Sequence, residues 1–432
     1  MNKQQIEPRD SAQNKEKRAA TSLILLCWLV YSCSYIGKVN YSANINLIQE
    51  YFKIDSYSTV GLAGTLFSFA YGIGQIVNGI LCKKYNIKWI IFASLCTSGL
   101  INLAIPLMPV FSPIKYLWVI NGFSMSILWP TLIRLLAQTM PKKYMAKASV
   151  VMGTTVAIGT FFVYGSSAAF ALFTDFRAAF YTAAVVLLGV AIIWIFSVSK
   201  NVAAVESFKD EQNDGVAVAS ENVQKKTVDK RAIYLIICTL ALCGIATNLI
   251  KDGLGTWVPS ILKKMYELDN SLSIILTLAL PIVSIFGNAF AVFMHKRVSD
   301  FVYQCALMFS ASGIIIAAVI GAVSLNSFVL TLVGFAAVSL LVSSCNSLIT
   351  SIFPLFMKGK VNSGLIAGVL NGFCYVGSTL STYVLGSIAD NSGWMAVFWV
   401  LLFVCVAVVA IAVAYALVRR FVMKIGFMHR DE

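Results

Sequence analysis

The sequence is poor in charge. Only 12% of its 432 residues are Asp, Glu, Lys or Arg, whereas 59% are hydrophobic. Soluble proteins carry about 25% charged residues, so this composition and a mean hydropathy of +0.81 exclude a soluble domain. The first twenty residues are polar and lack a short apolar core with a cleavage site, so we expect no signal peptide.

Groups that carry enzyme chemistry are also scarce. There are two histidines, and the ten cysteines fall in or beside apolar segments without the spacing of metal ligands. Such cysteines are typical of small packing residues. We find no nucleotide-binding loop and no nucleophile–base pair, so the sequence predicts neither an enzyme nor a cofactor.

Long apolar runs dominate instead. A membrane-spanning helix needs about 20 apolar residues, and twelve such runs occur, in two sets of six. They lie at 21–48, 59–82, 89–110, 115–139, 147–171, 178–198, 232–260, 272–294, 301–321, 328–352, 363–386 and 395–418. We therefore predict an all-α integral membrane protein whose twelve transmembrane helices form two six-helix bundles in the lipid bilayer.

The polar segments divide this architecture. We predict an N-terminal tail at 1–20, a first bundle at 21–198, a second at 232–418 and a C-terminal tail at 419–432. The segment 199–231 holds twelve charged residues and few aromatics. Such a composition does not support a core, so we interpret this segment as a flexible linker.

Lysine and arginine predict the orientation. If both termini are cytoplasmic, 25 of the 33 Lys and Arg lie in cytoplasmic segments and five lie outside, as the positive-inside rule requires. Topology thus explains most of the net charge of +14, and no basic patch on a soluble domain indicates nucleic-acid binding. We expect a multi-pass protein of the plasma (cytoplasmic) membrane.

Three cations remain inside the predicted helices: Lys38, Arg134 and Lys251. Lys38 comes 18 residues after Ala20, and Lys251 comes 19 residues after Ala232, so the two lysines lie at matched depth in equivalent helices. A lysine in a membrane costs at least about 2.5–3.5 kcal/mol and usually serves function. The alternative is that the side chains reach the outer headgroups.

Several motifs together resemble the organophosphate:phosphate antiporter family of the major facilitator superfamily. They are YSCSYIGKVNYS, AYGIGQ, WPTLIR, LIKDGLGTWVPSIL, NGFCYVGS and LGSIADNSGW, in that order. The resemblance covers all twelve helices and excludes the linker. It implies parallel six-helix halves with an anion site between them at the middle of the membrane.

In that family two arginines bind the substrate's phosphate, and their positions match Lys38 and Lys251. The resemblance further implies supporting tyrosines at Tyr31, Tyr35, Tyr71 and Tyr375, each of which could instead be a core aromatic. Arg134 matches a family arginine near the cytoplasmic end and is a candidate for coupling or gating. The alternatives are a structural partner and a side chain that reaches the headgroups.

The departures from the family affect the expected substrate. Lysine is a point charge, whereas arginine presents a planar fork, so two lysines select less strongly against carboxylates. Gln75 replaces a basic residue of the glycerol-phosphate branch, and Thr155 approximately replaces a histidine. Lys83 and Lys84 occupy the position of an Asp-Arg pair in the family, and His295 occupies a position where the family carries an acidic residue.

Other polar residues occur at membrane depth. Each can line a cavity or form hydrogen bonds between helices; they are Gln75, Asn78, Asn248, Asn346 and Asn371. Asp252 is the one acid well inside a predicted helix. Adjacent helical residues do not face each other, so we expect Asp252 to point about 100° away from Lys251 and to act in coupling or gating.

These observations predict a monomeric secondary transporter of a small organic anion, most simply a phosphorylated metabolite exchanged for inorganic phosphate. One alternative is a hexuronate-type carboxylate symporter that uses the same lysines. Another is a transporter-like membrane sensor that binds the anion and signals to a partner. The sequence carries no additional domain that supports signalling.

Overall fold

A computed structural model describes residues 6–81, 86–173, 175–208, 230–357 and 363–422, and in these residues the regular structure is helical throughout. Eleven stretches of helix are long and apolar enough to cross a membrane. One of them, Ile366–Arg420, has 55 residues, which at about 1.5 Å per residue is more than twice the roughly 30 Å hydrocarbon core. It crosses twice, so the twelve predicted crossings are confirmed.

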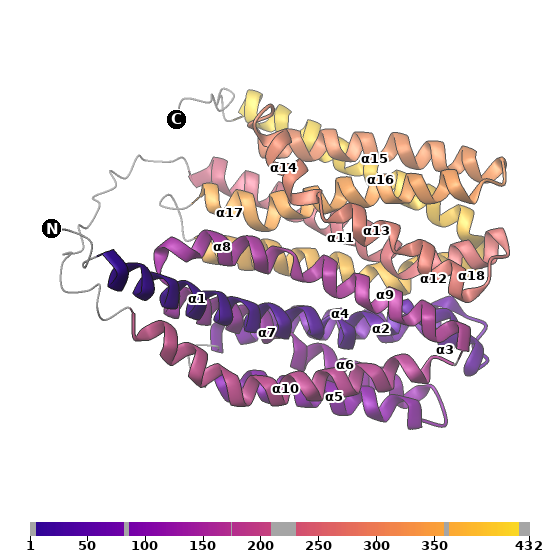
Figure 1. Cartoon of the computed structure of the whole chain (residues 1–432). Helices are drawn as coiled ribbons and strands as arrows, with labels where there is room; N and C mark the ends of the chain where they lie inside the picture. The colour runs from indigo at the N-terminus through magenta and orange to yellow at the C-terminus, as the bar shows by residue number, and fades with distance from the viewer. Residues whose placement is uncertain (1–5, 82–85, 174, 209–229, 358–362, 423–432) are drawn as a thin grey trace.

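The turn between the last two crossings is a glycine. Helix α18 (Ser363–Leu417) is interrupted at Gly393, which has φ 77° and ψ 172°. Glycine adopts a positive φ without the steric cost of a Cβ atom. The two arms of α18 therefore run in opposite directions, one in orange and one in yellow in Figure 1.

The first half of the chain supplies six crossings. In order, their elements are α1 (Ile6–Ser34), α2 (Ile36–Ala43) and α3 (Ile45–Tyr51); α4 (Tyr57–Leu81); α5 (Ile87–Ala104) with η2 (Ile105–Leu107); α6 (Ser112–Met125) and α7 (Leu128–Thr139); α8 (Lys142–Gly153) and α9 (Thr155–Phe173); and α10 (Arg177–Glu206). We call this group the N-half.

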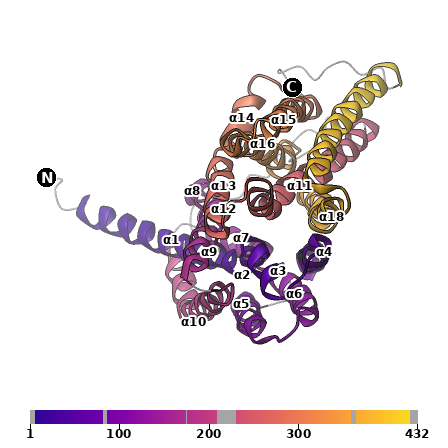
Figure 2. The ribbon, with the colours of Figure 1, turned by 90° about the vertical axis from the view of Figure 1, so that its right-hand side faces the viewer.

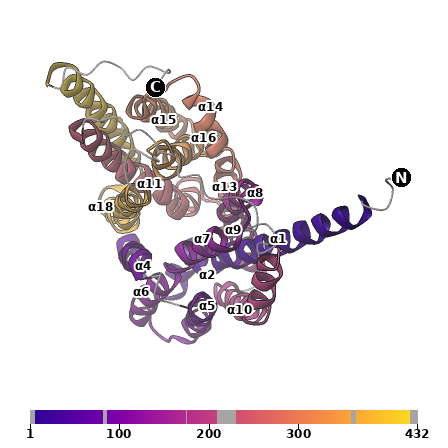
Figure 3. The same ribbon diagram turned by 90° about the vertical axis from the view of Figure 1, so that its left-hand side faces the viewer.

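The second half repeats the arrangement. Its elements are α11 (Lys230–Tyr266); α12 (Asn270–Thr277), α13 (Ala279–Ser284) and α14 (Gly287–His295); α15 (Phe301–Ser324); α16 (Phe328–Ser347) with η4 (Leu348–Ile352) and α17 (Phe353–Phe356); and α18 with η5 (Val418–Val422). We call this group the C-half. Viewed along the helices, the two halves form separate groups (Figure 2), and the first arm of α18 lies beside α4 at their boundary (Figures 2 and 3).

An ion pair and hydrogen bonds join the halves at one end of the molecule. We call this the distal end: it contains α3, the start of α4 and the start of α12, opposite the end where α1 begins (Figure 1). There Glu50 forms an ion pair with Lys263, and the Ser260 hydroxyl donates a hydrogen bond of 2.5 Å to Asn46. Residues of both halves also share one hydrophobic cluster.

Helix boundaries differ from the prediction in several places. The predicted first helix is broken at Tyr35 and Asn44, and α1 already begins at Ile6, within the predicted tail. The tail contains Gln, Glu, Lys and Ala, which favour helix. Helix α10 similarly extends to Glu206, inside the predicted linker, of which 209–229 lie outside the described residues. The predicted C-terminal tail begins with η5, and its residues 423–432 also lie outside them.

Candidate anion-binding site

Lys38 is held inside the N-half by close backbone packing. It lies in the short helix α2 and is only 8% exposed. A Cβ atom added to the neighbouring Gly37 would lie 2.6 Å from Leu187 and 2.8 Å from Ser98. The absence of a side chain at Gly37 therefore lets α2 pack closely against α5 and α10. The Asn121 side chain also donates a hydrogen bond of 2.8 Å to the Gly37 carbonyl.

Three tyrosines surround the Lys38 ammonium. Its Nζ lies 4.6 Å from the ring centroid of Tyr35, 4.7 Å from that of Tyr31 and 5.1 Å from that of Tyr71. Such cation–π contacts each contribute about 0.5–2 kcal/mol. Nζ also donates a hydrogen bond of 3.4 Å to the Tyr71 hydroxyl, which accepts a second one of 3.1 Å from Gln75. The structure thus brings four of the predicted residues together around Lys38.

Tyr375 adds a contribution from the other half. Its ring centroid lies 5.0 Å from that of Tyr71, so the lysine's aromatic surroundings reach across the boundary between α4 and α18. Trp129, on α7, packs against Tyr31 with ring centroids 4.7 Å apart. The structure therefore places Tyr375 beside the Lys38 site, and Trp129 packs against one of the tyrosines of that site.

Lys251 has different surroundings. It lies in α11, and its Nζ is 3.5 Å from Oδ1 of Asp252, with 31% of the lysine and 35% of the aspartate side chain exposed. The expectation that these side chains point apart was therefore wrong. Neighbouring Cα–Cβ bonds do diverge on a helix, but the four-carbon lysine stem is long and flexible enough for its end to reach back.

A network of hydrogen bonds holds Asp252. Its Oδ2 accepts a hydrogen bond of 2.5 Å from the Ser378 hydroxyl on α18. Ser378 in turn accepts one of 3.1 Å from Asn248, whose amide oxygen accepts one of 3.0 Å from Asn346 on α16. Asn248 and Asn346 thus form hydrogen bonds between helices, one of the two roles considered for them.

Sequence reasoning missed Ser378. A serine inside an apolar helix carries no distinctive signal, because its hydroxyl commonly bonds a carbonyl of its own helix. Only the packing of α18 against α11 identifies it as the partner of Asp252.

The remaining candidates lie apart from these contacts or play local roles. Asn371 is partly buried on α18, and Arg134 is partly buried in the middle of α7. The Asn78 side chain donates to Ser126, the Thr155 hydroxyl donates to the Met152 carbonyl, and His295 bonds Gln304. Lys83 and Lys84 lie outside the described residues.

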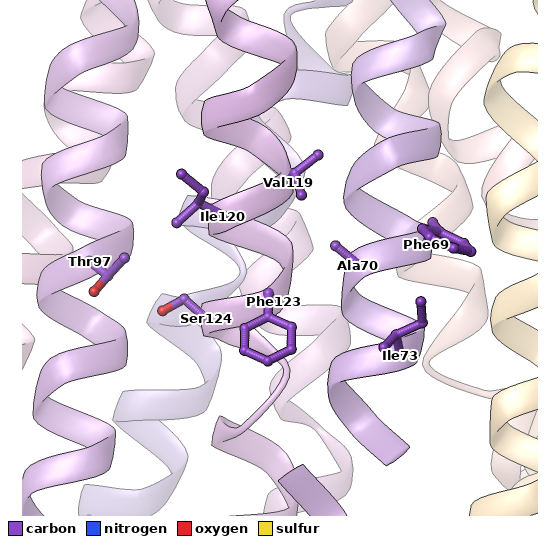
Figure 4. Close-up of a pocket in the computed structure, with 8 residues that line it drawn as sticks. All are labelled: Phe69, Ala70, Ile73, Thr97, Val119, Ile120, Phe123 and Ser124. Atoms are coloured by element: carbon purple, nitrogen blue, oxygen red, sulfur yellow. The ribbon is translucent and has the colours of Figure 1, made fainter. Parts of the chain in front are cut away.

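A surface pocket of about 570 Å³ does not belong to this site. It lies between α4, α5 and α6 (Figure 4) and is lined by Phe69, Ala70, Ile73, Thr97, Val119, Ile120, Phe123 and Ser124. Its lining side chains are nearly all apolar, and Phe69 and Ile120 are more than half exposed. These features are typical of a surface that faces lipid rather than an anion.

The fold is similar to that of solved transporters. A bacterial homologue of the human lysosomal transporter Spinster, in an inward-facing and occupied conformation, superposes with a TM-score of 0.71. The alignment covers 94% of this chain and 97% of that chain at 14% sequence identity. This likeness concerns the fold alone.

The sequence is also similar to curated proteins. The membrane sensor protein UhpC of Escherichia coli is 21% identical over 394 residues, which cover 88% of each chain. The human sugar phosphate exchanger 3 is 21% identical over 383 residues, which cover 79% of this chain and 76% of that protein. The profile of the Major Facilitator Superfamily matches residues 27–365. The chain therefore belongs to the major facilitator superfamily of membrane transporters, and its relatives confirm the resemblance to the organophosphate:phosphate antiporter family.

Proposed function

We propose that this protein is a secondary transporter that carries a phosphorylated sugar or a similar small phosphate ester across the plasma membrane. Lys38 and Lys251 bind the phosphate group, and Tyr31, Tyr35, Tyr71, Gln75 and Tyr375 position Lys38 and the substrate. The names of the similar proteins, a sugar phosphate exchanger among them, favour this substrate class over other anions.

The observation that carries the proposal is that the charge of Lys38 is buried and is not paired with a carboxylate of the described residues. Its ammonium is buried among aromatic rings and one hydroxyl, and no carboxylate in the described part of the chain forms a salt bridge with it. A buried charge without a counter-ion is unfavourable. An arriving oxyanion would supply the missing counter-charge, and Lys38 could donate hydrogen bonds to it.

Transport would proceed by alternating access between the halves. With cytoplasmic termini, as the distribution of Lys and Arg predicts, the distal end faces outward. The contacts of Glu50 with Lys263 and of Asn46 with Ser260 then close the outer side. We further propose that the physiological reaction is exchange for inorganic phosphate and that the protein works as a monomer.

A second function has a specific observation in its favour. UhpC, similar to this chain over 88% of its length, is named a membrane sensor protein. A sensor would bind the same anion at the same lysines but would not move it at a useful rate. A measurement of flux therefore distinguishes a transporter from a sensor, whereas a measurement of binding does not.

The test combines binding with flux. A thermal-shift screen of the purified protein should show stabilisation by hexose phosphates and inorganic phosphate, and weaker or no stabilisation by hexuronates. Proteoliposomes should then accumulate the labelled hexose phosphate. Binding without uptake would favour the sensor, and preferential stabilisation by hexuronates would favour the carboxylate carrier.

A further inference from the structure

The two site lysines differ in how their charge is balanced while the site is empty. Lys38 has aromatic rings and a hydroxyl around it, whereas Lys251 has a carboxylate 3.5 Å from its Nζ. Two cations and one anion therefore share the region between the halves. Helix α18 connects their surroundings, because it carries both Ser378, which bonds Asp252, and Tyr375, whose ring packs against the Tyr71 that bonds Lys38.

The Asp252 carboxylate is held in place by a neighbouring helix, whereas the Lys251 ammonium can move. Asp252 has a short side chain, and Ser378 on α18 holds its Oδ2. Ser378 is itself only 2% exposed and is bonded to Asn248, which is 5% exposed. Lys251 forms a longer contact at the end of a flexible side chain that remains 31% exposed. An incoming oxyanion can therefore draw Lys251 toward itself, while Asp252 stays in place.

We propose that Asp252 is a specificity-determining residue that sets the charge of the accepted substrate. The charges of Lys38, Lys251 and Asp252 sum to one positive charge, so an anion with a single negative charge neutralises the site. A dianion leaves one excess negative charge beside the buried Lys38 and its aromatic surroundings, where an unbalanced charge is costly. The inference rests on the proposed function, because it assumes that the anion binds between these lysines.

The decisive comparison uses two probes of nearly equal shape. Glucose 6-sulfate carries one negative charge, whereas glucose 6-phosphate is almost entirely a dianion at pH 8, since its second pKa lies near 6. Dissociation constants of both should be measured on the full-length protein at pH 8. Asp252→Asn should lower the constant for the phosphate at least tenfold relative to that for the sulfate.

Two variants serve as controls. Asp252→Glu keeps the charge and should retain the wild-type ratio of the two constants. Asp269→Asn makes the same chemical change at an exposed N-cap of α12, where Asn also caps well, and should leave the ratio unchanged.

The possible failures are distinguishable. If the wild type binds the probes but Asp252→Asn keeps their ratio or weakens phosphate binding selectively, Asp252 does not set the substrate charge, although the proposed function stands. If Asp269→Asn changes the ratio as much as Asp252→Asn, the effect is not specific to the site and the inference is overturned. A wild type that binds neither probe refutes the proposed function and the inference together.

Discussion

The Asp390 carboxylate of the C-half accepts a hydrogen bond of 2.6 Å from the backbone N–H of Tyr57, the first residue of α4 in the N-half. It also accepts hydrogen bonds of 2.8 Å from the Ser58 N–H and 2.9 Å from the Ser56 hydroxyl. The first N–H groups of a helix have no partners within the helix, and a negative charge is favourable there. One half of the molecule therefore caps a helix of the other.

This cap predicts how Asp390 affects the balance of conformations. Removing a cap costs about 0.5–2 kcal/mol, which changes a two-state population ratio by roughly two- to thirtyfold. Because the cap joins the two halves at the closed distal end of this structure, Asp390→Ala should favour distal opening. Distances between genetically encoded spin labels at Asp55 and Leu325, on the distal loops of the two halves, should shift toward longer values.

The neighbouring residue provides a control. The Asn391 side chain bonds the Ser387 carbonyl within its own helix, so Asn391→Ala should leave the label distances unchanged. Equal distance distributions in Asp390→Ala and the wild type would show that the cap does not contribute to closure.

A second prediction concerns the two site lysines. A hydrogen bond to a charged group contributes about 1.5–3 kcal/mol, so Lys38→Gln and Lys251→Gln should each weaken anion binding by roughly 10- to 150-fold or abolish it. Binding is measured by isothermal calorimetry with glucose 6-phosphate. The exposed Lys264 supplies the control, and Lys264→Gln should bind normally. Normal affinity in either site variant would remove that lysine from the site.

A third prediction isolates one hydroxyl. Tyr71→Phe keeps the ring beside Lys38 but removes the oxygen that bonds both Lys38 and Gln75. A neutral hydrogen bond contributes about 0.5–1.5 kcal/mol, so substrate affinity should fall by roughly two- to twelvefold. Tyr266→Phe removes a hydroxyl that bonds Thr331 elsewhere in the C-half and should not change affinity. If Tyr71→Phe and Tyr266→Phe bind the substrate with equal affinity, the Tyr71 hydroxyl does not contribute to substrate binding.

The architecture could be predicted from the sequence because a helix must have a minimum apolar length to cross a bilayer. Each crossing requires a long apolar run, and all twelve runs are present. The breaks at Tyr35 and Asn44 could not be predicted in the same way. They depend on how α2 packs between its neighbours, and neither residue is a proline or glycine that would signal a break.

The candidate site, like the fold, could be predicted only in part. Lys38 and Lys251 stand out because charge inside an apolar helix is rare, and the family resemblance indicated Tyr35, Tyr71 and Gln75. The pairing of Lys251 with Asp252 was not predicted. The rule that adjacent helical residues point apart describes the direction of their Cβ atoms and not the reach of a long side chain. Ser378 was not predicted because its role, a hydrogen bond to Asp252, depends on how α18 packs against α11.

The last prediction concerns exchange. Within the described residues no carboxylate pairs with Lys38 in the empty site, whereas Asp252 balances the charge of Lys251. Changing conformation with one unbalanced charge should be slower than changing it with a bound anion. We therefore expect proteoliposomes that contain inorganic phosphate to take up labelled glucose 6-phosphate several-fold faster than empty ones, with little effect of an imposed pH gradient. Because the ion pair already balances one lysine, some net uptake by empty vesicles is expected. Uptake that is equal in loaded and empty vesicles, driven by an inward proton gradient and lost in Asp252→Asn, would instead identify Asp252 as a proton site and rule out exchange.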